Sequence, residues 1–153
     1  MKTYTETDHQ ELSSRLQNLI RHYEPLLASL PEEEVGHKPN PEKWSSKEIL
    51  GHLCDSAINN YHRFIRLQIE EEPFRVEKYV QDEWVRLAGY HQRNWLHIYQ
   101  LWLGLNHAIA EVLQILKPAS LSSVVQIGEE IRDFHFLIKD YLDHMEHHLL
   151  QFN

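Results

Sequence analysis

Apolar residues recur every three or four positions in four long segments of the chain, which is the spacing of one face of an α-helix. We expect helices over Thr7–Leu30, from Ser46 to about Glu72, over His91–Leu116, and from Phe134 toward the C-terminus. Pro25 lies inside the first segment and should kink it or separate its last turn, because proline removes a backbone donor. An amphipathic helix cannot bury its apolar face alone. The pattern therefore predicts an all-α four-helix bundle.

Two of these helices have start signals. Ser45 and Glu48 spell a capping box, and Trp44 and Ile49 occupy the two positions of a hydrophobic staple. Asp133 has the side chain expected of an N-cap for the last helix. The second helix should accordingly begin immediately after Ser45.

The connections between the helices are less regular. Residues 31–44 contain three prolines and a glycine, which predict a loop with one helical turn at Glu32–Val35. Residues 73–89 form a long link with a short helix around Asp82–Leu87. Residues 121–131 fit either a loop or a short extended piece. The two later links are long enough to cross an end of the bundle, so loop length leaves the topology open.

Length, charge and cysteine content indicate the domain organisation, the kinds of partner and the cellular location to expect. A chain of 153 residues suits a single domain over residues 1–153. A formal charge of -8, with no basic stripe, makes nucleic acid an unexpected partner. The apolar runs are too short to cross a bilayer. Cys54 has no second cysteine to pair with, and the first residues lack a signal peptide, so we expect the cytoplasm.

Three histidines are candidate metal ligands. His144 and His148 stand four residues apart, which on a helix leaves their rings about 40° apart around the axis and about 6 Å apart along it, within reach of one ion. His147 lies about 100° from His148 and should face solvent. His52 lies two turns into the second helix, where a buried polar group needs a partner. Each has a simpler explanation alone, as a polar patch or a core histidine, but together they predict an open Zn²⁺, Ni²⁺ or Fe²⁺ site.

Polar residues follow the second-helix histidine at intervals of one turn. Ser56, Asn59 and Arg63 form either a solvated helix face or the wall of a substrate pocket, in which Arg63 offers a planar fork to a carboxylate. Asp55 and Asp143 are candidates to hydrogen-bond and orient the imidazoles, although surface salt bridges are the commoner role for such carboxylates. The sequence assigns no catalytic residue.

Two blocks of sequence resemble the DinB/YfiT-like superfamily. The first runs from Trp44 to Ser56 and is followed by Asn59 and by Arg63-Phe64; the second runs from Asp140 to Leu149. The resemblance covers almost the whole chain in the order of its segments, but only these blocks are specific. The ending of the sequence, residues 149–152, departs from that of many relatives, which leaves the histidines intact but weakens any analogy of substrate.

The resemblance implies a four-helix bundle in which three histidines hold a divalent metal, usually zinc or nickel, at the positions of His52, His144 and His148. Members with known activity are S-transferases that use low-molecular-weight thiols such as bacillithiol, or thiol-dependent isomerases; others are described as metal-dependent hydrolases. Homodimers are common. We expect an enzyme that activates a thiol or water toward a small-molecule substrate, with a non-catalytic metal-containing binding or stress-response module as the alternative.

Overall fold

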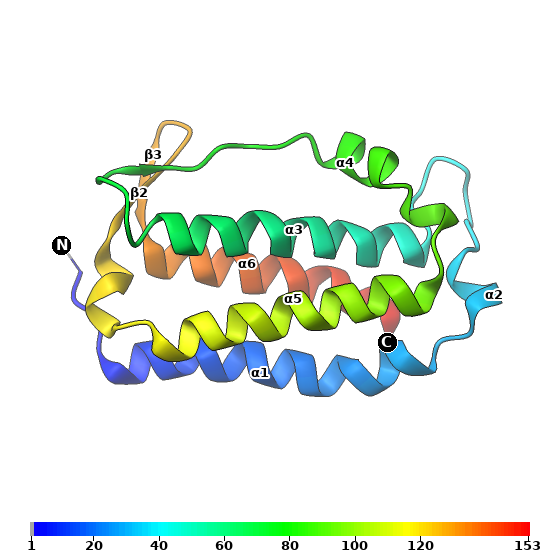
Figure 1. Cartoon of the computed structure of the whole chain (residues 1–153), viewed down its shortest axis with the longest axis horizontal. Coiled ribbons are helices and arrows are strands. Elements are labelled where there is room, and N and C mark those ends of the chain that lie inside the picture. The colour runs from blue at the N-terminus through cyan, green and yellow to red at the C-terminus, as the bar shows by residue number, and fades with distance from the viewer. Residues whose placement is uncertain (1) are drawn as a thin grey trace.

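The computed structural model describes residues 2–153, and its four long helices pack side by side as a bundle (Figure 1). These are α1 (Glu6–Ser29), α3 (Ser46–Arg66), α5 (Trp95–Ile115) and α6 (Phe134–Leu149). Helices α1 and α3 each pack against both α5 and α6. The predicted four-helix bundle is confirmed.

The connecting segments contain short helices. The expected turn at residues 32–35 and the expected helix near residues 82–87 are both present, as α2 (Glu32–Val35) and α4 (Gln81–Ala88). Three 3₁₀ turns complete the helical elements, namely η1 (Tyr90–Gln92), η2 (Pro118–Ser122) and η3 (Leu150–Phe152). Figure 1 shows the segment before α4 crossing the length of the bundle beside α3. This crossing segment forms one wall of the cavity described below.

A small sheet accompanies the bundle; the short extended piece that residues 121–131 allowed is present as β2 (Val124–Ile127) and the start of β3 (Glu130–Asp133), but the pairing into a sheet was not predicted. Strand β2 pairs antiparallel with β3 and parallel with β1 (Phe74–Arg75). Phe74 lies opposite Val125, and both side chains are buried. The fold is therefore mostly helical with one added sheet, rather than purely helical.

Three helix boundaries differ from expectation. Helix α3 ends at Arg66 instead of continuing to about Glu72, because the chain must leave the helix to bring Phe74 into the sheet. Helix α5 begins at Trp95 instead of His91, because the Asn94 side chain caps it by accepting the N–H of residue 96 at 2.9 Å. Helix α1 continues unbroken through Pro25 to Ser29.

The predicted start signals are confirmed. The Ser45 side chain accepts the backbone N–H of Glu48 at 3.3 Å, and the Glu48 carboxylate accepts the N–H of Ser45 at 3.2 Å. Asp133 accepts the N–H of Phe136 at 2.8 Å and so caps α6. These caps fix the two helices that carry the candidate histidines. Within residues 2–153, none of the helices combines the length and the apolar character needed to cross a membrane.

Candidate metal centre

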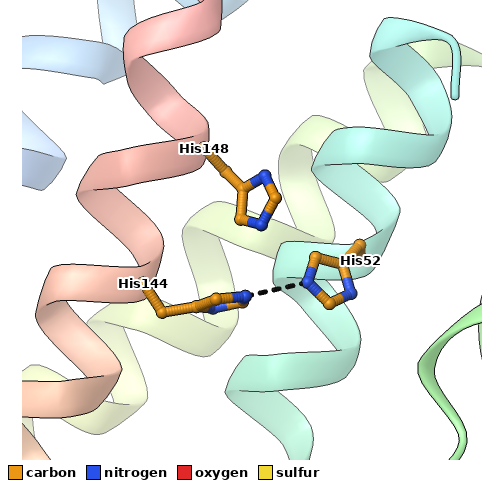
Figure 2. Close-up of side chains that lie close together, drawn as sticks. All are labelled: His52, His144 and His148. Atoms are coloured by element: carbon orange, nitrogen blue, oxygen red, sulfur yellow. Dashed lines mark hydrogen bonds between the residues drawn. The ribbon is translucent and has the colours of Figure 1, made fainter. Parts of the chain in front are cut away.

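Three histidines from α3 and α6 meet inside the bundle. Figure 2 shows His144 and His148 pointing from α6 toward His52 on α3. The Nε2 atoms of His52 and His144 are 2.9 Å apart, and one ring nitrogen from each of the three side chains lies within 4.8 Å of the other two. His52 is only 1% exposed, and the other two are half-buried. The structure thus brings together the three residues that were singled out as ligands.

The chemistry of this donor set fits a divalent cation. Two nitrogens bound to tetrahedral zinc at about 2.1 Å lie about 3.4 Å apart, which is above the 2.9 Å between His52 and His144 and below the 4.8 Å within which all three nitrogens lie. Among residues 2–153, no carboxylate forms an ion pair with any of the three imidazoles. A group of imidazoles that has no anion to stabilise protons offers its lone pairs to a cation instead.

The electrostatics of the cluster keep the imidazoles neutral. Burial, together with the neighbouring His144 and His148, lowers the pKa of His52 to about 3. Burial and the adjacent imidazoles lower the pKa of His148 to about 4, and burial also lowers the pKa of His144. Metal coordination requires the neutral imidazole. All three side chains are therefore in the protonation state of a ligand at neutral pH.

Two further residues contact the cluster, and sequence reasoning did not assign them to the site. The Trp44 ring lies 4.9 Å from the His52 ring, measured between centroids. The Gln151 amide nitrogen lies 3.3 Å from Nδ1 of His148, which leaves the other ring nitrogen to face the cluster. Trp44 was recognised only as a staple residue, and Gln151 stands in the segment that departs from relatives. His147 is exposed, in the orientation that helix geometry predicted.

A cavity of about 350 Å³ opens beside His144, between α3, α6 and the segment that precedes α4. Ser56 and Arg63 line it, as expected of a pocket wall. Asn59 does not line it, and its side chain donates to the backbone carbonyl of Asp55 at 2.8 Å. Asn60 lines the cavity in its place. Adjacent helical positions differ by about 100° in direction, so an error of one residue exchanges the two asparagines.

The two aspartates predicted to orient imidazoles have other partners. Asp55 is buried and accepts the hydroxyl of Tyr90 at 2.6 Å, while its second carboxylate oxygen has no hydrogen-bond partner among the described residues. Asp143 lies at the surface and pairs with Arg15 and Lys139, each at 2.7 Å. In residues 2–153 neither carboxylate hydrogen-bonds an imidazole, so the structure contradicts these two assignments.

A second hollow, of about 550 Å³, lies on the other side of the cluster. Trp44, Ile49, His148 and Gln151 are among the residues that line it. Because one cavity reaches His144 and the other reaches His148, the cluster can be approached from two directions.

The fold and the cluster define a mostly helical four-helix bundle in which three histidines converge from the second and last long helices. The sequence model of the DinB superfamily matches residues 15–152, and the chain belongs to that superfamily. This family assignment confirms the resemblance found in the sequence.

One protein of related sequence and one solved structure illustrate the similarity. The chain is 28% identical over 85 residues to a protein of Halalkalibacterium halodurans named "Putative metal-dependent hydrolase BH0277"; the match covers 56% of this chain and 49% of that protein, about half its length. The structure resembles that of YfiT from Bacillus subtilis, described as "a probable metal-dependent hydrolase with an unusual four-helix bundle topology". The TM-score is 0.84 at 17% identity, and the match covers 99% of this chain and 87% of YfiT.

The fold also resembles a mycothiol-dependent maleylpyruvate isomerase, with a TM-score of 0.77 at 15% identity. That match covers the whole of this chain and 64% of the isomerase. At such identities the structural likeness shows a shared fold, and the activities belong to those proteins.

Proposed function

We propose that His52, His144 and His148 hold one divalent cation, zinc or nickel, and that the protein is a metal-dependent enzyme acting on a small molecule. The observation that carries this proposal is the convergence of three neutral imidazoles, within 4.8 Å, beside a cavity of about 350 Å³. Closed structural zinc sites use four protein ligands, whereas three ligands leave room for a reactant. The name of the Halalkalibacterium halodurans relative supports metal dependence.

A divalent cation in such a site lowers the pKa of a bound thiol or water and supplies a nucleophile near neutral pH. The chain's own residues would position the reactants. Arg63 and Ser56 offer hydrogen-bond donors in the cavity, and the Trp44 ring shields His52 from water. We favour a low-molecular-weight thiol such as bacillithiol as co-substrate, since the two hollows beside the histidines offer room for two reactants.

The alternative is a non-catalytic module in which the cation only ties α3 to α6. Elemental analysis of protein purified without an affinity tag tests the shared part of both proposals, with one equivalent of zinc or nickel as the expected result. Turnover of model electrophiles with a panel of thiols, and with water alone, then separates them. We expect thiol conjugation that His148→Ala abolishes and His147→Ala retains. Metal bound without any turnover favours the module, and a wild-type protein that binds no metal refutes both.

The family resemblance also leads us to propose a homodimer located in the cytoplasm. The outer face of α3 exposes Ile58, Tyr61 and Ile65, which are spaced as one helical stripe and offer an apolar contact surface. Sedimentation equilibrium should give twice the monomer mass of 18.3 kDa. A monomer at micromolar concentration would refute the dimer without affecting the metal site.

A further inference from the structure

Three charged side chains line the cavity beside His144 without an oppositely charged partner. Within residues 2–153, Arg63, Lys78 and Asp140 take part in no ion pair. Nearby side chains on the same helices are paired, Arg66 with Glu70 at 2.5 Å, and Lys139 with a carboxylate one turn later at 2.7 Å. The cavity therefore presents three charged groups that no ion pair neutralises.

Arg63 is held in place with donors to spare. One of its terminal nitrogens donates to the backbone carbonyl of Glu77 at 2.6 Å, and the other lies 3.5 Å from the Asn60 side-chain oxygen. A guanidinium has five N–H donors, so several remain free. Burial lowers the pKa of Arg63 and raises that of Asp140, which reflects the cost of keeping each charge out of water.

The signs of these charges are divided between the walls of the cavity. The two cations come from α3 (Arg63) and from the segment that precedes α4 (Lys78), whereas the anion comes from α6 (Asp140). Asp140 lies one helical turn before His144, about 6 Å along the axis, so one small molecule can contact both. The field across the cavity would orient a ligand that carries both charges.

We propose that this cavity binds a small zwitterion with an α-amino acid head group, its carboxylate on Arg63 and Lys78 and its ammonium on Asp140. The proposal deepens the proposed function and rests on it in one respect, that the ligand's remaining group, a thiol, faces His144. The ligand class is an α-amino acid thiol, of which L-cysteine is the smallest member. An anion without an ammonium would be repelled by the Asp140 carboxylate. A cation without a carboxylate would be repelled by Arg63 and Lys78.

The proposal is tested with L-cysteine and with two thiols that each lack one of its charged groups. Isothermal titration calorimetry would measure the dissociation constants of L-cysteine, 3-mercaptopropionate, which lacks the ammonium, and cysteamine, which lacks the carboxylate. The measurements use reduced protein, both loaded with one equivalent of zinc and freed of metal. A hydrogen bond to a charged group contributes strongly to binding. We therefore expect L-cysteine to bind at least about tenfold more tightly than either truncated thiol.

Substitutions should separate the two halves of the ligand. Arg63→Gln should weaken the binding of L-cysteine and 3-mercaptopropionate about tenfold without weakening that of cysteamine. Asp140→Asn should weaken the binding of L-cysteine and cysteamine without weakening that of 3-mercaptopropionate. Matched controls on the same helices, Arg66→Gln and Asp143→Asn, remove paired charges and should change none of the three constants. Lys78→Gln, at an exposed position, repeats the carboxylate test should Arg63→Gln fail to fold.

The two proposals fail in different ways. Equal affinities for the three thiols, or equal losses for all three in both variants, would overturn the zwitterion site even in a protein that holds zinc and turns over. Selectivity for L-cysteine in a protein that binds no zinc would support the zwitterion site and refute the metal-dependent enzyme.

Discussion

The ring of Tyr90 lies directly against Gly51, one residue before the histidine that α3 contributes to the cluster. A Cβ at Gly51 would stand only 2.2 Å from two carbons of the Tyr90 ring. From this position the Tyr90 hydroxyl donates to Asp55 at 2.6 Å. The absence of a side chain at Gly51 thus allows η1 to pack closely on α3, next to His52.

Gly51→Ala should therefore destabilise the fold, against the usual preference of helices for alanine. The added methyl group must displace a buried aromatic ring, and such overpacking costs typically about 1–3 kcal/mol. Urea unfolding followed by circular dichroism measures the change. Gly104→Ala is the matched control, because Gly104 is an exposed helical glycine with no atom within 4 Å of an added Cβ. It should stabilise the protein by roughly 0.5–1 kcal/mol, and equal effects of the two substitutions would refute the packing argument.

Tyr90→Phe tests the hydrogen bond separately from the packing. It keeps the ring against α3 but leaves the buried Asp55 without a side-chain donor, since the second carboxylate oxygen already has no partner among residues 2–153. An unsatisfied buried group costs about 1–3 kcal/mol, and a charged group costs more. Tyr61→Phe, at a tyrosine that is 38% exposed on α3, should change the free energy of unfolding by less than about 0.5 kcal/mol. An unchanged free energy of unfolding in Tyr90→Phe would show that this hydrogen bond contributes little to stability.

The three ligand candidates should share one phenotype. Replacing His52, His144 or His148 by Ala should lower metal content strongly, because two remaining imidazoles hold a divalent cation weakly. His147→Ala removes a neighbouring histidine that is exposed and, although its ring lies 5.2 Å from that of His148, offers no nitrogen to the cluster, so this variant should retain full metal content. Elemental analysis of the purified variants decides this. Full occupancy in His52→Ala would exclude a site shared between α3 and α6.

Local signals predicted much of this architecture, and non-local pairing accounts for most of what they missed. The capping box at Ser45 and the N-cap at Asp133 act within one helical turn, and both are present in the structure. The sheet depends on Phe74 lying beside Val125, far away in the sequence, and on strands of two to four residues that are too short to show a pattern. That same pairing ends α3 earlier than periodicity suggests.

The candidate site divides in the same way. Helix geometry placed His52, His144 and His148 inward and His147 outward, and all four orientations are found. The cavity was harder to foresee, because Lys78 reaches it from an irregular segment that has no periodicity to read. Whether Asn60 or its neighbour Asn59 faces the cavity depends on how α3 is rotated against α6. Tertiary packing sets that rotation, and a sequence pattern resolves it only to about one residue.

Lowering the pH should reduce the free energy of unfolding of the metal-free protein, because His52 takes up a proton on unfolding. In the unfolded chain this histidine takes up a proton near its ordinary pKa of 6.5, whereas burial and the neighbouring imidazoles lower its pKa in the fold to about 3. Between these values the unfolded state binds more protons than the folded state, so the free energy of unfolding falls as the pH falls. Linkage gives a loss of about 2 kcal/mol from His52 between pH 7 and pH 5. Above pH 7 this contribution is constant.

Urea unfolding of protein freed of metal by a chelator, measured at intervals from pH 7 to pH 5, tests the acid effect. The comparison is with His52→Gln, which keeps a polar side chain at a 1% exposed position but cannot titrate in this range. The wild-type stability should fall more steeply than that of His52→Gln, whatever the difference between them at pH 7. Parallel pH profiles would mean that His52 takes up its proton equally in both states. The neutral imidazole that the proposed metal site requires would then not be a property of the fold.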